Sequence, residues 1–427
     1  MNVGIIGLWH LGSVTSACLA NYGYNIIGYD VDKEVIKNLN KGVSPIEEPF
    51  LEDLIKENIR KNNLRFTSDL KEAIKDSDFV FLTIDTPVDE NDDVDLSSVF
   101  SSIDDMIGFL KEDTTIIIQS QVPVGTCNEL VNRIKQNTKS KFNLAYCPEN
   151  LRLGKAIELF QNPDRIIIGA DSQETLDKVS VFFDIIGCPK VTMDLKSAEM
   201  TKHAINAFLA TCISFINWIG NACGETGADA NKVSEGLMTE KRIGKNLPLR
   251  PGLGFAGGTL GRDLKILINL GRELKVNPEL FEAVVNTNNA QNIIAIKKLQ
   301  KIFGKLENLT IGILGLTYKP GTNTLRRSSS IEIINEIASM GANVKAFDPA
   351  INEINTEMHR NFKLTDNAYA TAEKSDVLVV MTDWPEFRDL DYKKILGIIK
   401  KPVILDMKNC LDQKYLRGIG FSYHRVG

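Results

Sequence analysis

The opening segment of the chain constrains the fold more than any other. Residues 3–6 form a short apolar strand, residues 7–12 carry a glycine at each end, and apolar side chains at 13–22 recur at helical spacing. A second strand at 25–29 ends at Asp30, close to the separation of about 20 residues at which a carboxylate holds a ribose hydroxyl. The pattern predicts a βαβ unit that binds a dinucleotide pyrophosphate at its helix N-terminus.

Within this unit, Gly7, Leu11, Gly12 and Asp30 are the predicted cofactor-binding residues. An acidic residue at the end of the second strand favours NAD over NADP. The middle glycine of the usual GxGxxG pattern is replaced by Trp9, at the position where backbone normally approaches the pyrophosphate. A Rossmann-like domain that binds no nucleotide is therefore the alternative interpretation.

Strands and helices continue to alternate along the first third of the chain. The strands are expected at 79–84, 115–119, 144–146 and 166–168. The carboxyl ends of parallel strands meet at one edge of an open sheet, where ligands bind. We therefore assign Thr86 and Thr126, which follow two of these strands, to the cofactor, and Glu149 to catalysis. An isolated glutamate there would more often be a charge at a helix start.

The middle of the chain is predicted to be helical, with one long helix over 196–224. Its apolar residues recur at helical spacing at Ala204, Phe208, Cys212, Phe215 and Ile216. Lys202 and Asn206 are four residues apart, so they share a face and could bind an oxyanion; the alternative is a solvated surface pair. Further helices are expected at 228–238, 263–274 and 278–302. This block is a natural dimer surface.

The stretch from Gly254 to Asp263 contains four glycines and ends with a hydroxyl, a cation and a carboxylate. Glycine lets backbone approach a ligand closely, so we interpret the stretch as a ligand-enclosing loop. Gly254 and Gly257 are assigned to the substrate, and Thr259 and Asp263 to catalysis. A tight structural loop is the alternative.

The last third repeats the pattern of the first. A strand and turn at 309–315 precede a helix at 330–340 and a strand that ends at Asp348. Further strands are expected at 377–381 and 403–405. Lys319, Arg326 and Arg327 lie in loops, where they could hold phosphates. The predicted fold is α/β, with two Rossmann-like α/β domains (1–195 and 304–427) joined by a helical central domain (196–303) with a long connecting helix.

Composition narrows the class of protein. A chain of 427 residues is long enough for two or three domains. Its net charge of −5 argues against a nucleic acid or an acidic membrane as partner. The seven cysteines form no CxxC pair, so no metal site is expected. The N-terminus lacks the features of a signal peptide, and no apolar run is long enough to span a bilayer. We therefore expect a cytoplasmic protein.

Taken together, the motifs resemble the UDP-glucose/GDP-mannose dehydrogenase family over nearly the whole length. The matching stretches are 30–32, 45–49, 123–126, 148–149, 162–165, Lys202 with 206–209, 242–244, the glycine stretch to Asp263, 316–320, Arg326 with Ser328, 348–349 and 384–387. The resemblance implies NAD-dependent oxidation of a nucleotide sugar at C6, from alcohol through aldehyde to carboxylate. Uridine is the expected base, surface polysaccharide synthesis the expected pathway, and a homodimer or higher homo-oligomer the expected assembly.

The same resemblance implies roles for individual residues. Lys202 and Asn206 would stabilise the developing oxyanion, Asp263 would orient or activate water, and Glu149 would assist the second oxidation. Arg242 resembles an arginine that reaches the ligand from a neighbouring subunit. Lys319 and Arg326 match residues where cofactor and substrate meet.

Departures from the family pattern leave the chemistry open. Thr259 stands where the family has a cysteine that adds to the aldehyde, Gln121 replaces a threonine, and Cys147 replaces an asparagine. A threonine hydroxyl needs an adjacent base to act as a nucleophile. Four interpretations follow: double oxidation through an aldehyde hydrate, a single oxidation that stops at a carbonyl, Cys147 as substitute nucleophile, or a non-catalytic binding protein.

A different class of enzyme shares part of this pattern. Hydroxyacid dehydrogenases of the phosphogluconate type also join a Rossmann domain to helices and use a Lys-x-x-x-Asn pair. They usually lack a third α/β domain with a stretch like 384–387. Nucleotide diphosphate binding by the last third would favour the nucleotide-sugar interpretation.

Overall fold

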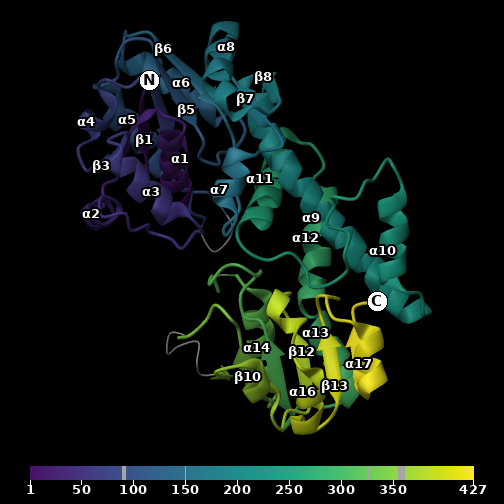
Figure 1. The fold of residues 1–427 in the computed structure, drawn as a ribbon. Helices are drawn as coiled ribbons and strands as arrows, with labels where there is room; N and C mark the ends of the chain where they lie inside the picture. The colour runs from purple at the N-terminus through teal and green to yellow at the C-terminus, as the bar shows by residue number, and fades with distance from the viewer. Residues whose placement is uncertain (89–92, 150, 326, 354–360) are drawn as a thin grey trace. The chain divides into compact units, whose positions relative to one another are not determined.

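The structure is a computed structural model that describes residues 1–88, 93–149, 151–325, 327–353 and 361–427. It divides into two compact units, Met1–Ala204 and Ile205–Gly427. Figure 1 colours the chain from purple at the N-terminus to yellow at the C-terminus. The three-domain division at 1–195, 196–303 and 304–427 stays a prediction.

The first unit is built on an eight-stranded sheet with the order β3-β2-β1-β4-β5-β6-β7-β8. Its strands are β1 (Asn2–Ile6), β2 (Asn25–Tyr29), β3 (Leu64–Thr67), β4 (Phe79–Leu82), β5 (Thr114–Ile118), β6 (Phe142–Tyr146), β7 (Ile166–Gly169) and β8 (Lys190–Met193). One pair in this sheet is not parallel, because β6 and β7 are antiparallel. The chain leaves β6 and turns back at the same edge, instead of crossing the sheet again before β7.

Helices pack against this sheet around an apolar core. They are α1 (His10–Asn21), α2 (Lys33–Leu39), α3 (Leu51–Arg60), α4 (Leu70–Ile74), α5 (Ser97–Ile107), α6 (Thr126–Asn137), α7 (Ala156–Gln161) and α8 (Gln173–Phe182). Helix α1 is buried from Gly12 to Ala20, and its small side chains let it lie close to the sheet. Val3, Phe81 and Phe182 belong to the same core.

The second unit contains a six-stranded parallel sheet with the order β11-β10-β9-β12-β13-β14. Its strands are β9 (Thr310–Leu314), β10 (Asn343–Phe347), β11 (Lys363–Leu364), β12 (Val377–Val380), β13 (Val403–Asp406) and β14 (Ser422–Arg425). Counted within its own unit, this order is that of the first six strands of the other sheet, the Rossmann order. The predicted fold class is confirmed.

Helices make up most of the rest of the second unit. They are α9 (Leu195–Thr226), which starts in the first unit, α10 (Ala230–Thr239), α11 (Thr259–Leu274), α12 (Glu279–Asn292), α13 (Ile294–Phe303), α14 (Ser329–Ser339), α15 (Ala368–Ala372), α16 (Tyr392–Ile398) and α17 (Gln413–Ile419). Figure 1 labels most of them. The sequence pattern predicted one helix over 278–302, but Ile293, with ψ near 2°, separates α12 from α13. Helix α11 also begins earlier than expected, so Thr259–Asp263 is helical rather than part of a loop.

The long helix α9 buries several polar side chains and exposes several aromatic ones. Lys202, Asn206 and Asn217 are at most 8% exposed, whereas Phe208 and Phe215 are about half exposed. Helix α9 is the one helix of the described chain that is long and apolar enough to cross a membrane, and 44% of its most apolar window is buried. Core helices of soluble proteins pass the same test, so this is weak evidence for a membrane.

Candidate active site

The turn between β1 and α1 requires glycine at two positions. Gly7 has a φ of +91°, and a Cβ added at Gly12 would lie 1.8 Å from the carbonyl oxygen of Gly7. Trp9, the departure from the usual pattern, has an ordinary φ of −72°. Its side chain is 47% exposed. The tryptophan therefore leaves the conformation of the turn undisturbed.

A hollow of about 340 Å³ lies beside this turn, lined among others by Gly7, Leu8, Trp9 and Asp30. The Asp30 carboxylate accepts hydrogen bonds from the N–H groups of Leu8 (2.8 Å) and Asp32 (3.0 Å), which ties the turn to the end of β2. Helix α1 has no side-chain cap and no acidic residue in its first turn. Its free amide donors and positive dipole end therefore favour an anion at this point.

The other predicted cofactor residues do not line this hollow. Leu11 is half-buried, and Thr126 is buried at the start of α6. Thr86 is buried and donates its hydroxyl hydrogen bond to the carbonyl of Gln121 at 2.8 Å. A direct cofactor role for these three residues stays a prediction.

The first turns of α9 hold the loop that follows β5. The buried Glu199 carboxylate accepts the N–H groups of Gly125 (2.6 Å) and Cys127 (2.7 Å). The buried His203 ring bonds the carbonyl of Val122 at 2.9 Å. Sequence reasoning missed both residues. Their signal was an acid and a histidine four positions apart, on one face of a predicted helix.

Lys202 and Glu149 are brought together within the first unit. The Lys202 ammonium, 7% exposed, donates to the backbone carbonyl of Glu149. The half-buried Glu149 carboxylate accepts the N–H of Leu151 instead. The backbone carbonyl of Glu149, after β6, therefore fixes the Lys202 ammonium. The Glu149 carboxylate is held by a backbone N–H of its own loop.

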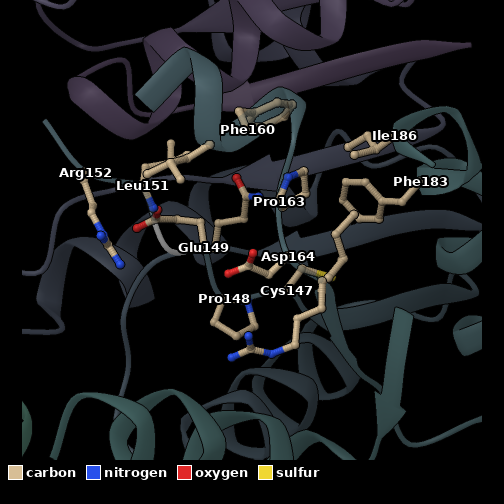
Figure 2. A pocket seen from close by; sticks show the side chains of 14 residues that line it. Cys147, Pro148, Glu149, Leu151, Arg152, Phe160, Pro163, Asp164, Phe183 and Ile186 are labelled. Atoms are coloured by element: carbon tan, nitrogen blue, oxygen red, sulfur yellow. The ribbon is translucent and has the colours of Figure 1, made fainter. Parts of the chain in front are cut away.

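Figure 2 shows the cavity beside Glu149, with Phe160, Phe183 and Ile186 on one side and Asp164 near its centre. Its volume of about 110 Å³ is well below the ~300 Å³ of a small-molecule pocket. Cys147 lines it but is only 3% exposed. Burial raises the pKa of the Cys147 thiol far above its ordinary value. The thiol is therefore protonated at neutral pH and a poor nucleophile.

Glu48 is a positioning residue that sequence reasoning did not single out. Its buried carboxylate accepts the N–H groups of Gly154 (2.9 Å) and Ala156 (2.8 Å) and bonds the His10 ring at 3.0 Å. It thereby anchors the loop that follows Glu149 to the first residue of α1. The available signal was its place in the 45–49 stretch between two prolines.

Asn206 and Asp263 form a buried pair in the second unit. The Asn206 amide on α9 donates to the Asp263 carboxylate on α11, and these side chains are 8% and 0% exposed. Thr259 is the exposed first residue of α11. Within the described ranges its hydroxyl makes no hydrogen bond, so no neighbouring base activates it.

Buried side-chain amides hold the glycine loop. Asn288 of α12 accepts the N–H of Phe255 (2.6 Å) and donates to its carbonyl (3.0 Å). Asn217 of α9 accepts the N–H of Gly252 at 2.8 Å. A Cβ at Gly254 would lie 2.5 Å from the Asn288 side-chain oxygen, which leaves room only for glycine. No sequence motif pointed to these two amides.

The other end of the glycine loop contacts the segment after β9. Gly257 donates its N–H to the carbonyl of Arg327 at 3.1 Å, and its Cα lies against the ring of Tyr318. Half-buried Lys319 places its ammonium 5.5 Å from the centre of that ring. Two predicted substrate segments, the glycine loop and the β9 loop, are therefore adjacent. Arg326 lies outside the described residues.

Two further cations differ in their surroundings. The Arg242 side chain is 87% exposed and pairs with Glu240 at 3.1 Å on its own turn. Lys408, which sequence reasoning missed, follows β13 at the carboxyl edge of the sheet that also carries Lys319 after β9. Burial lowers the pKa of Lys408, although Asp383 opposes the shift. A desolvated lysine at this edge is suited to binding an anionic ligand.

Comparison with known proteins places these features in one family. Models of the UDP-glucose/GDP-mannose dehydrogenase family match the chain at residues 1–186 (NAD binding domain), 196–290 (central domain) and 312–413 (UDP binding domain). The UDP-glucose 6-dehydrogenase TuaD of Bacillus subtilis is 34% identical over 100% of this chain and 93% of its own length. The chain belongs to the UDP-glucose/GDP-mannose dehydrogenase family. It is accordingly an NAD-dependent nucleotide-sugar dehydrogenase that acts on a CH–OH group.

Other members of the family agree with this assignment. The UDP-glucose 6-dehydrogenase of Rickettsia bellii is 36% identical, with 100% of this chain and 99% of the relative covered. A UDP-glucose dehydrogenase from Pyrobaculum islandicum superposes with a TM-score of 0.90 at 28% identity, covering 100% of this chain and 97% of the other.

A hydroxyacid-type enzyme shares only the fold. The 3-hydroxyisobutyrate dehydrogenase of Mycobacterium tuberculosis has a TM-score of 0.50 at 14% identity and covers 67% of this chain and 91% of its own. The match of the UDP binding domain at 312–413 separates our chain from that class.

The residues around the β1–α1 turn fit the NAD that the family requires. The backbone approaches closely at Gly7 and Gly12, where no Cβ would fit. The uncapped amides of α1 can receive a pyrophosphate, and half-buried Asp30 can accept a ribose hydroxyl. The predicted cofactor is thereby confirmed by the family and is compatible with the local geometry.

Proposed function

We propose that this dehydrogenase oxidises the C6 alcohol of a UDP-sugar to a carboxylate in two steps. The buried Asn206–Asp263 pair carries the proposal. It keeps an amide donor on α9 and a carboxylate on α11, the helix that follows the glycine loop, in fixed orientation. Support for uridine comes from the UDP binding domain match and from relatives named UDP-glucose 6-dehydrogenase.

In the first step, R–CH₂OH + NAD⁺ gives R–CHO + NADH + H⁺. Bound NAD accepts the hydride in each oxidation. Lys202 and Asn206, one turn apart on α9, hold the substrate oxygen as the C–H bond breaks and negative charge develops on it. The backbone carbonyl of Glu149 fixes the Lys202 ammonium, so little reorganisation is needed during the reaction.

In the second step, water adds to the aldehyde, and R–CH(OH)₂ + NAD⁺ gives R–COO⁻ + NADH + 2H⁺. Asp263 orients or deprotonates the water, and Glu149 assists the loss of the second proton. Two observations favour this hydrate route over a covalent one. In the described part of the chain the Thr259 hydroxyl makes no hydrogen bond to a base, and the Cys147 thiol is buried and protonated.

A single oxidation that stops at a carbonyl is the second candidate. The observation in its favour is the same exposed, unactivated Thr259, because without a covalent adduct the aldehyde could leave before a second hydride transfer. Gln121 and Cys147 also replace residues that the family usually has near the chemistry.

The deciding experiment is the stoichiometry of the reaction. Purified protein with excess NAD is given limiting UDP-glucose, other UDP-sugars or GDP-mannose, and NADH formed per sugar consumed is counted. Two NADH with a uronic acid product supports the proposal, whereas one NADH with a carbonyl product supports the single oxidation. No NADH with any of these sugars, despite measurable binding, would contradict both.

Replacement of Thr259 tests the route within the same assay. Thr259→Ala is expected to leave turnover within about threefold, because the hydroxyl has no activating base. Thr259→Cys is the matched control, since it restores a thiol at the same exposed position. If turnover of Thr259→Ala fell by about 100-fold or more, as it usually does when a catalytic group is removed, the hydrate route would be contradicted.

We also propose that the enzyme is a homodimer that pairs through the exposed face of α9. Phe208, Phe215 and Trp218 are 56%, 49% and 61% exposed, and their spacing places them on one side of the helix. Exposed aromatic residues gathered on one surface are typical of protein interfaces. The exposed Arg242 is suited to reach a ligand in a partner subunit.

Light scattering after gel filtration tests the assembly. Phe215→Glu is expected to convert dimer to monomer, whereas Val276→Glu, at a 63% exposed position off this helix, should leave the mass unchanged. A wild-type monomer at micromolar concentration would contradict the proposal. So would a Phe215→Glu variant that remains a dimer.

A further inference from the structure

The second unit contains a hollow that shares no lining residue with the segments assigned to the nucleotide sugar. It lies among the end of α9, the start of α10, and α13, α17 and β14, and its volume is about 470 Å³. We call it the α13–β14 hollow. Its size falls within the range of about 300–1,000 Å³ typical of small-molecule sites.

Basic side chains form a large part of the lining of the α13–β14 hollow. They come from three separate elements: Lys298 and Lys301 on α13, Arg417 on α17, and His424 and Arg425 on β14. Two of them have acidic partners, since Lys301 pairs with Glu225 at 3.1 Å and Arg425 with Asp229 at 2.6 Å. Arg425 also donates to the backbone oxygen of Gly427.

Among the described residues, the remaining basic groups form no ion pair with an acid, although the charge of Glu225 acts on Lys298. Within the described ranges, no carboxylate lies within ion-pair distance of Lys298. Arg417 donates to the backbone carbonyl of Tyr423 at 3.2 Å, which leaves its charge unneutralised. His424 bonds Ser422, also a neutral group, at 2.9 Å. The hollow therefore gathers positive charge from residues that are far apart in sequence.

The titration of these groups reflects their mutual repulsion. Burial lowers the pKa of Lys298 and Lys301 lowers it further, while Glu225 opposes the shift. Burial also lowers the pKa of His424, with Lys298 and Arg417 adding to the effect. Like charges held together in a partly buried site cost stability unless an anion neutralises them.

We propose that the α13–β14 hollow binds a small phosphate-bearing anion. Two lysines and an arginine around one hollow suit phosphate oxygens, which accept several charge-assisted hydrogen bonds at once. The ligand would join α13 to β14 and α17. Because it binds only the folded unit, it would stabilise the C-terminal part of the protein.

Pyrophosphate is the probe for the test, with the full chain and NMR of its four histidines, His424 being assigned with His424→Gln. Binding is expected to raise the pKa of His424, because the anion cancels the field of Lys298 and Arg417. The double variant Lys298→Gln/Lys301→Gln should weaken this binding at least about tenfold, or about 1.4 kcal/mol. The His424 signal reports this hollow even if pyrophosphate also occupies the nucleotide site.

The matched control is Lys297→Gln, next to Lys298 on the same helix but exposed and outside the lining. It should leave the His424 response unchanged. Equal weakening by this variant would show a general charge effect and overturn the proposal, as would no shift of His424 at millimolar pyrophosphate. Folding is checked by the melting temperature without ligand, which neutralising the unpaired Lys298 should not lower.

Discussion

The two Rossmann sheets use an aspartate at the same place for different purposes. Asp30 follows β2, and Asp348 follows β10, the second strand of the other sheet. Asp30 is half-buried, accepts the N–H of Leu8 and lines the hollow beside the turn. Asp348 is 1% exposed. Its Oδ2 accepts hydrogen bonds from Leu316, from Thr317 twice and from the indole of Trp384.

The difference teaches that strand order and residue type do not settle function. A carboxylate with accessible oxygens can accept a ribose hydroxyl, whereas one saturated by protein donors holds its own loop. The segments that follow the first strand of each sheet also differ. Helix α1 follows Gly7 almost at once, but the segment from Gly315 to Ser328 separates β9 from α14 and leaves room for substrate-binding residues.

The largest expected effect is the loss of Asp348. Asp348→Ala leaves several buried donors without an acceptor, so the free energy of unfolding should fall by about 3–5 kcal/mol. Urea unfolding followed by circular dichroism measures it. Asp30→Ala is the matched control, with an expected loss of about 1 kcal/mol because its site is open to water. Equal losses in the two variants would remove the distinction between the sites.

A second pair of aspartates tests the comparison through pH. Asp78 precedes β4 and accepts the N–H of Asn2, and Asp376 precedes β12 and accepts the N–H of Thr310, both at 3.0 Å. Burial alone would raise the pKa of each, but the N–H and a lysine outweigh it and lower both. The Asp376 side chain is 0% exposed, that of Asp78 37%.

A lowered pKa in the folded state means that the stabilisation is present above the unfolded pKa of about 3.9 and is lost as pH falls below it. Asp376→Asn should therefore cost about 1–3 kcal/mol at pH 7 and much less near pH 3. For the more exposed Asp78→Asn, a loss below about 1 kcal/mol is expected. Urea unfolding between pH 3 and 7 measures both, and a pH-independent loss in Asp376→Asn would contradict the assignment.

Asp30 should matter most for the cofactor. Asp30→Asn is expected to raise KM for NAD about 10- to 100-fold, or about 1.4–2.7 kcal/mol, with kcat little changed, because a ribose acceptor is weakened away from the reacting carbon. Steady-state kinetics measure KM for NAD and kcat separately. Asp348→Asn, at the equivalent place in the other sheet, is the control. An unchanged KM for NAD would show that Asp30 only holds the turn.

The smallest effect is expected at Trp9. Trp9→Gly restores the usual glycine pattern, but Trp9 already has an ordinary φ and a half-exposed side chain. The dissociation constant of NAD should change by less than about threefold, well under 1.4 kcal/mol. Isothermal titration calorimetry measures this dissociation constant. Tighter binding by tenfold would show that the indole obstructs the cofactor.

Much of the fold and part of the site could be predicted from the sequence. The strand at 343–347 and the helix from 330 lie within a residue of their predicted limits, because apolar alternation and turn glycines act over short distances in the chain. Asn206 and Asp263 were assigned to one site, and the structure joins them by a hydrogen bond. The helical start at Thr259 and the break at Ile293 were missed, since neither has a cap or a proline to announce it.

The sequence by itself determined the repeated βα pattern, the glycines at Gly7 and Gly12 and the family, because these depend on local backbone preferences and on residue order. Only the tertiary structure decided which polar groups are available. Asp30 and Asp348 look alike in sequence, yet their partners come from across the sheet. Asn288, 33 positions after Phe255, holds the glycine loop in place. Hydrogen bonds over such separations depend on packing, which no short stretch of sequence encodes.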